Sequence, residues 1–79
     1  MYSMVTIYSA DWCAFCHAAK QYFEKKGVTY EERNIEHSQE FAEESVKKSG
    51  QMGIPVIDID GEIIVGFDRP KIDAALAKA

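Results

Sequence analysis

The sequence has few cysteines, few prolines and no excess of positive charge. Its 79 residues include two cysteines, two prolines, and 9 basic against 13 acidic side chains, so the formal net charge is −4 at pH 7. Two cysteines are too few for a disulfide-rich secreted scaffold. A negatively charged surface repels nucleic-acid phosphates and anionic lipid headgroups. We therefore expect neither nucleic acid nor a membrane surface as a partner.

Long apolar runs are also missing. No run approaches the roughly 18 residues of a membrane-spanning helix, and the first residues lack the basic segment that begins an export signal. We therefore expect a cytoplasmic protein. No internal repeat, low-complexity tract or long linker interrupts the chain. Because a chain of this length supports one core, residues 1–79 are expected to form a single domain.

Hydrophobic periodicity and turn residues divide the chain into seven expected elements. The expected strands are residues 4–9, 28–35, 56–59 and 63–65, and the expected helices are 13–26, 38–48 and a last one beginning near 68. Asp60-Gly61 suits the two positive φ values of a type I′ hairpin turn. With right-handed crossovers, the order β-α-β-α-β-β-α predicts an α/β domain: a four-stranded mixed sheet flanked by three helices.

Both cysteines, Cys13 and Cys16, lie where the first strand gives way to the first helix. A disulfide closing so short a loop constrains the unfolded chain by only about 2 kcal/mol, so a purely structural role explains it poorly. At a helix N-terminus, unpaired backbone N–H groups and the helix dipole stabilise a thiolate, the reactive form of cysteine. We predict that Cys13 attacks a target disulfide. Cys16, one turn along and less exposed, would then displace the product.

An X-Pro step, Ile54-Pro55, leads into the third expected strand. If this peptide bond is cis, Ile54 can offer its backbone N–H and C=O to an extended substrate. If it is trans, Pro55 is simply the first residue of a strand. The sequence by itself leaves both possibilities open.

Three motifs, in this order and spacing, resemble the glutaredoxin and thioredoxin superfamily. They are YSADWCAFC at residues 8–16, Gly53-Ile54-Pro55 and Gly66-Phe67-Asp68. The resemblance covers essentially the whole chain and is to small dithiol glutaredoxin-like proteins of bacteria and archaea. It implies a thioredoxin fold and a disulfide oxidoreductase that acts on protein disulfides or glutathione mixed disulfides. It also implies glutathione as cosubstrate, with no bound cofactor.

The resemblance implies roles for individual residues. Cys13 matches the nucleophile of the family, and Cys16 matches its resolving cysteine. The residues expected to bind substrate or glutathione are Trp12, Phe15, Ile54, Pro55, Gly66, Phe67 and Asp68. Phe15 matches the aromatic wall of the glutathione groove, although it could instead be the edge of its helix's apolar stripe. Asp68 matches the acid that holds the γ-glutamyl end.

Three positions depart from the common glutaredoxin pattern. Ala14 replaces a proline, Ala10 stands where many members have a basic residue for the glycyl carboxylate, and Val65 replaces a glycine. In addition, the segment 66–70 is similar to the Gly-Phe-Arg-Pro segment of the redoxins. Those proteins are reduced by thioredoxin reductase and supply electrons to ribonucleotide reductase. This second interpretation stays open beside the glutathione-dependent one.

Other uses of the cysteines fit the sequence less well. Residues 13–17 match the C-x-x-C-H pattern of covalent haem attachment, but attachment needs export, and the expected strands contradict an all-helical haem domain. With His17 and His37, the cysteines lack the second ligand pair of a structural zinc site, so we predict no metal site. An iron–sulfur cluster bridging two protomers through Cys13 and glutathione remains an alternative that the family implies. We expect a monomer that carries no iron–sulfur cluster.

The remaining expectations concern packing. We expect Tyr8 and Tyr22 in the core, and both histidines on the surface. The acidic residues Glu40, Glu43 and Glu44 are expected on a solvated helix face.

Overall fold

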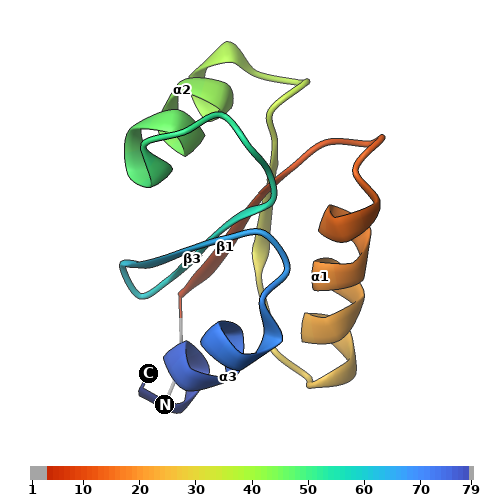
Figure 1. Cartoon of the computed structure of the whole chain (residues 1–79). Coiled ribbons are helices and arrows are strands. Elements are labelled where there is room, and N and C mark those ends of the chain that lie inside the picture. Colours follow the sequence, from red (N-terminus) through yellow and green to blue (C-terminus); the bar gives the residue numbers. More distant parts are fainter. Residues whose placement is uncertain (1–3, 79) are drawn as a thin grey trace.

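A computed structural model of the chain describes residues 4–78, in which seven elements follow the predicted order. Residues 1–3 and 79 of the predicted domain lie outside the described part. The strands are β1 (Val5–Ser9), β2 (Glu31–Asn34), β3 (Val56–Ile59) and β4 (Glu62–Val65), and the helices are α1 (Ala14–Lys25), α2 (Gln39–Ser49) and α3 (Arg69–Lys78). Figure 1 shows α1 and α3 on one side of the sheet and α2 on the other.

The sheet has the predicted mixed topology, with strand order β2-β1-β3-β4. β1 pairs in parallel with β2 and antiparallel with β3, and β4 completes an antiparallel hairpin with β3. Tyr8 near the end of β1 lies opposite Val56 at the start of β3. The chain therefore leaves β1 and enters β3 at the same edge of the sheet.

Two groups of buried side chains form the interior. The larger one packs the sheet against α1 and α3, and its buried members are Val5, Ile7, Ala19, Phe23, Ile57, Ile59, Ile64, Ile72 and Ala75. The smaller one consists of Ala10, Cys13 and Cys16 at the edge where β1 ends. The sulfur atoms of Cys13 and Cys16 are therefore buried in a small apolar group that is separate from the main core. None of the helices within residues 4–78 is long and apolar enough to cross a membrane.

The predicted hairpin turn is confirmed, and side chains cap the N-termini of α2 and α3. Asp60 and Gly61 have φ values of 52° and 92°, as a type I′ hairpin turn requires. Ser38 Oγ accepts a hydrogen bond from the N–H of Phe41 at 3.4 Å, which caps the N-terminus of α2. Asp68 does the same for α3, accepting from the N–H of Lys71 at 3.3 Å.

The predicted second strand was too long at its start. Val28 does not belong to β2, because its N–H donates to the carbonyl oxygen of Phe23 at 2.9 Å. Gly27, with φ of 73°, donates to the carbonyl oxygen of Glu24 at 3.1 Å. These two bonds form a Schellman motif, so the first residues after α1 complete the helix and only then does the strand begin.

The prediction that Glu44 lies on a solvated face was also wrong. The side chain is half-buried, and Glu44 Oε1 accepts hydrogen bonds from the Tyr8 hydroxyl at 2.9 Å and from Arg33 Nη1 at 2.5 Å. Tyr8 is fully buried, as predicted, and its ring lies 5.1 Å from Lys48 Nζ. The Tyr8 hydroxyl and the Arg33 guanidinium hold the pKa of Glu44 below its usual range. This cluster anchors α2 to β1 and β2.

Replacing Glu44 by glutamine should make stability less sensitive to acid. Because the folded state lowers the pKa of Glu44, the unfolded chain binds more protons near pH 4. The carboxylate's contribution is complete above about pH 5 and is lost as the pH falls through the folded-state pKa. The free energy of unfolding, measured in urea from pH 7 to pH 3, should therefore fall less steeply in Glu44→Gln than in the wild type.

Glu40→Gln is the matched control, because it removes one carboxylate from an exposed position of the same helix. Equal acid sensitivity of Glu44→Gln and the wild type would contradict the role of the Tyr8–Glu44–Arg33 cluster.

Candidate active site

Cys13 caps the N-terminus of α1. Its backbone is extended, with φ of −88° and ψ of 107°, and its Sγ accepts a hydrogen bond from the N–H of Cys16 at 3.2 Å. The first N–H groups of a helix have no partner inside the helix, and a side chain at the N-cap position normally satisfies one of them. Here a sulfur does so. Negative charge on Cys13 Sγ is therefore stabilised by a backbone donor and by the helix dipole.

The two cysteines are joined as a disulfide, with their Cα atoms 5.2 Å apart. Cys16 is fully buried, whereas Cys13 keeps 5% of its surface exposed. Cys13 is thus the one of the two that an incoming molecule can reach. Ile35 and Ile54 pack against the group that the two cysteines form with Ala10.

Ile54 packs against the group that contains both cysteines, and the Ile54-Pro55 peptide bond is cis. The carbonyl oxygen of Pro55 accepts a hydrogen bond from the N–H of Gly66 at 2.8 Å, which ties the start of β3 to the end of β4. Within residues 4–78, no hydrogen bond engages the N–H or the C=O of Ile54. One backbone donor and one acceptor therefore stand beside the reactive pair without a partner in the described chain.

Two aromatic residues flank Cys13 in the sequence and both are exposed. Trp12 exposes 70% of its surface and Phe15 exposes 67%. Phe15 is therefore not the edge of the apolar stripe of α1, which was one of its two interpretations. Both rings offer apolar surface to a molecule that approaches Cys13.

The three residues of segment 66–68 lie in different places, one near the cysteines, one on the core and one at the start of α3. Gly66, with φ of 83°, is bonded to Pro55 and lies at the site. The Phe67 side chain packs on the larger core, with its ring centroid 5.7 Å from that of Tyr22, so its ring does not face the cysteines. Tyr22 itself is half-buried, and not fully in the core as predicted. Asp68 uses one carboxylate oxygen to cap α3.

A polar network holds the loop that leads into Cys13, and the sequence did not reveal it. Asp11 Oδ1 accepts a hydrogen bond from Asn34 Nδ2 at 2.8 Å, and the N–H of Asp11 donates to Glu36 Oε1 at 2.9 Å. The carbonyl oxygen of Asp11 lies 2.9 Å from His17 Nε2, and its carboxylate lies 3.8 Å from His37 Nε2. Asp11 precedes α1, Asn34 ends β2 and His17 lies in α1, and their spacing forms no periodic pattern, so no sequence signal pointed to this network.

A second polar contact lies where β1 ends. Glu32 Oε2 accepts from the Ser9 hydroxyl and from Lys20 Nζ, each at 2.7 Å. The Lys20 ammonium and the Ser9 hydroxyl lower the pKa of Glu32. Because Lys20 follows Cys16 by one helical turn, this contact fixes α1 against β1 and β2 close to the cysteines. In the described part of the chain, no group of three or more histidine, cysteine or acidic side chains is placed to hold a metal ion.

Comparison with known proteins agrees with this geometry. A family model described as Glutaredoxin matches residues 5–64. An uncharacterized glutaredoxin-like 8.6 kDa protein in the rubredoxin operon of Clostridium pasteurianum is 39% identical over 75 residues, covering 95% of this chain and 100% of that protein. Glutaredoxin 3 of Escherichia coli K12 is 39% identical over 64 residues, covering 81% of this chain and 77% of that protein.

A solved structure shows the same architecture. The glutaredoxin-like protein NrdH-redoxin from Escherichia coli, described as having a thioredoxin-like activity profile, superposes with a TM-score of 0.79. It is 30% identical, and the match covers 90% of this chain and 92% of that one.

Replacing Asn34 by alanine should destabilise the fold through the loop before Cys13. The Asn34 amide is buried; it donates to Asp11 Oδ1 and its oxygen accepts from the N–H of Glu36, both at 2.8 Å. Losing both bonds should lower the free energy of unfolding of the oxidised protein by about 1–2 kcal/mol, measured in urea at pH 7.

Gln39→Ala serves as the control, because it removes only an exposed amide contact to Glu43. We expect it to change stability by less than about 0.5 kcal/mol. If the two variants lose the same stability, the Asn34 network does not hold the loop.

Proposed function

This chain belongs to the glutaredoxin family, and we propose that it reduces protein disulfides and glutathione mixed disulfides through Cys13 and Cys16, with glutathione as reductant. Family membership makes it a thiol-disulfide oxidoreductase, and the substrates and the reductant are what we propose. The observation that carries the proposal is the position of Cys13. Its Sγ accepts a backbone N–H at the start of α1 and lies beside the unpaired backbone groups of Ile54.

In the first step, the Cys13 thiolate attacks one sulfur of the target disulfide. A bond forms between the two sulfurs, the target S–S bond breaks, and the second target sulfur leaves as a thiolate that takes a proton from water. The N–H of Cys16 and the N-terminus of α1 stabilise the charge on Cys13 before the attack. The same groups make Cys13 a good leaving group afterwards.

In the second step, the Cys16 thiolate attacks Cys13 Sγ in the mixed disulfide. The target leaves as its second thiol, having gained two electrons, and the protein keeps the Cys13–Cys16 disulfide. Two molecules of glutathione then restore the dithiol and become glutathione disulfide. When the target is a glutathione mixed disulfide, Cys13 takes the glutathione sulfur and a second glutathione releases it. That route does not need Cys16.

Ile54 would align the target for this exchange. An extended polypeptide can pair with the N–H and C=O of Ile54 as a short β-bridge, which places its sulfur near Cys13. The exposed Trp12 and Phe15 rings, next to Cys13 in the sequence, would cover apolar parts of the bound molecule. Gly66 and Asp68 would contact glutathione through backbone groups and through the carboxylate oxygen that does not cap α3.

Thioredoxin reductase is a second candidate for the electron source, and ribonucleotide reductase for the acceptor. The similarity to NrdH-redoxin, whose activity profile is described as thioredoxin-like, supports this alternative. Ala10 supports it too, because it is buried and offers no cation to a glycyl carboxylate of glutathione. The two candidates share the Cys13 chemistry and differ in the molecule that resets the disulfide.

The two cysteines should differ in their substitution phenotypes. Cys13→Ser should abolish all exchange, because it removes the nucleophile. Cys16→Ser should block the reduction of insulin disulfides but keep part of the activity on a glutathionylated peptide, since only the first reaction needs the resolving thiol. Both activities are measured by steady-state turnover with glutathione. Wild-type turnover by Cys13→Ser would contradict the proposed function.

A pair of NADPH-coupled assays on the oxidised protein should identify the reductant. We expect turnover with glutathione plus glutathione reductase, and none with thioredoxin reductase alone. The reverse result would assign the protein to the redoxins and make residues 66–70 a reductase-facing surface.

Asp68→Asn tests glutathione recognition within the same assay. Asparagine keeps a capping oxygen for α3 but has no charge. Its KM for a glutathione mixed disulfide should rise several-fold, whereas the dithiol protein should reduce insulin in a single turnover without added glutathione at the wild-type rate. An unchanged KM would limit Asp68 to its role as a helix cap.

A further inference from the structure

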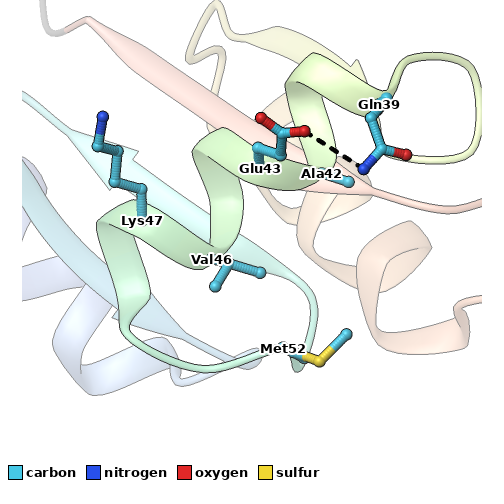
Figure 2. A pocket seen from close by; sticks show the side chains of 6 residues that line it. All are labelled: Gln39, Ala42, Glu43, Val46, Lys47 and Met52. Carbon is cyan, nitrogen blue, oxygen red and sulfur yellow. Dashed lines mark hydrogen bonds between the residues drawn. The ribbon is translucent and has the colours of Figure 1, made fainter.

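A groove lies along the outer face of α2, on the side of the loop that precedes Ile54. The groove is shallow and open, with a volume of about 420 Å³ and mainly apolar walls, and its lining residues are Gln39, Ala42, Glu43, Val46, Lys47 and Met52. Figure 2 shows Val46 on the edge of α2 that turns toward Met52, with the charged ends of Glu43 and Lys47 along the other edge. We call this surface the α2 groove. The functional site described above uses none of it.

The apolar floor of the α2 groove is exposed. Met52 exposes 83% of its surface and Val46 exposes 38%. Glu43 and Lys47 carry opposite charges, so the lining has no net charge. An uncharged, apolar occupant fits these walls better than an ion or a charged side chain.

The loop that presents Met52 is held in place by hydrogen bonds. The Gln51 side chain accepts from the N–H of Gly53 at 2.5 Å and donates to its carbonyl oxygen at 3.0 Å. The Ser49 hydroxyl donates to the carbonyl oxygens of Ser45 at 2.7 Å and of Gln51 at 2.9 Å. A Cβ at Gly53 would lie 2.6 Å from Gln51 Oε1, so a larger residue would displace the end of the Gln51 side chain. The exposure of Met52 is therefore built into an ordered loop.

One lining residue of the α2 groove lies next to the exchange site along the chain. Met52 precedes Ile54 by two residues, a stretch that spans at most about 7 Å. A polypeptide that pairs with the backbone of Ile54 needs only two to four further residues to pass over Met52. The same molecule can then contact Cys13 with its sulfur and the α2 groove with a side chain.

Resting on the proposed thiol-disulfide exchange, we propose that the α2 groove binds one apolar side chain of a polypeptide substrate. That side chain lies two to four residues from the cysteine that Cys13 attacks. The groove thereby favours disulfides within polypeptides of this pattern over small disulfides, which cannot reach it. Met52 and Val46 are specificity-determining residues that do not touch the reacting sulfurs.

The test uses peptides that carry one cysteine as a mixed disulfide with 2-nitro-5-thiobenzoate. The Cys13 thiolate of the dithiol protein attacks the peptide sulfur, and the coloured thiobenzoate leaves with the electron pair of the broken S–S bond. Leucine or serine is placed in turn at each position from two to four residues before or after the cysteine. The cysteine derivative without a peptide is the small-molecule control.

We expect one leucine position to release the chromophore about tenfold faster than its serine counterpart, which corresponds to about 1.4 kcal/mol of apolar burial. Met52→Gln should reduce this advantage to within about twofold, and Val46→Thr should reduce it in part. The rate with the cysteine derivative should stay unchanged, which also shows that the variants are folded. Met4→Gln is the matched control, because Met4 is 75% exposed at the opposite end of β1.

Each other outcome overturns the proposal in a recognisable way. If the leucine and serine peptides react at equal rates while release from the cysteine derivative is normal, the proposed role of the α2 groove is wrong and the exchange function stands. A leucine preference that survives Met52→Gln would locate apolar recognition elsewhere. A concentration-dependent dimer that Met52→Gln abolishes would assign the groove to a second copy of the chain. If the cysteine derivative releases no chromophore, both the proposed exchange function and the proposed role of the groove are wrong.

Discussion

The antiparallel pairing of β3 with β1 is the constraint on which the site depends. Tyr8 lies opposite Val56, so the chain enters β3 where it leaves β1. The segments that flank this pair, the loop into Cys13 and the Ile54-Pro55 step, are thereby placed side by side although about forty residues separate them in the sequence. A parallel β3 would carry Pro55 to the opposite edge of the sheet. Ile54 could then not pack against the group of Ala10, Cys13 and Cys16.

Two consecutive residues of β1, Tyr8 and Ser9, help to position the helices on the two faces of the sheet. Side chains of neighbouring strand residues point to opposite faces of a sheet. Tyr8 accordingly reaches α2 and donates to Glu44, whereas Ser9 donates to Glu32, the residue that Lys20 of α1 also contacts. In a domain this small, the apolar core is limited, and hydrogen-bonded polar contacts help to hold the helices. The start of α1 and the outer face of α2 therefore keep fixed positions relative to the cysteines.

The exchange reaction itself offers little means of selecting a substrate. Cys13 needs only a sulfur within reach, and its activation comes from the backbone N–H of Cys16 and from the end of a helix. Selectivity must come from surfaces around the sulfur that a larger molecule touches and a small one does not. Trp12, Phe15 and Met52 are exposed apolar side chains, and each lies within two residues of Cys13 or Ile54 in the sequence. Their exposure in a folded domain is consistent with surfaces that are covered when a substrate binds.

The sequence by itself determined the features that depend on local backbone preference. The element order, the hairpin turn at Asp60-Gly61, the helix caps and the position of Cys13 at a strand-to-helix junction were all predictable, because turn and cap geometry is set within a few residues. Only the tertiary structure decided which side chains from distant segments meet. The half-buried contact of Glu44 with Tyr8, the Asn34 network and the groove at Met52 join residues whose separation has no periodicity. A sequence pattern records the spacing along the chain, whereas these contacts depend on strand pairing and helix packing across the whole sheet.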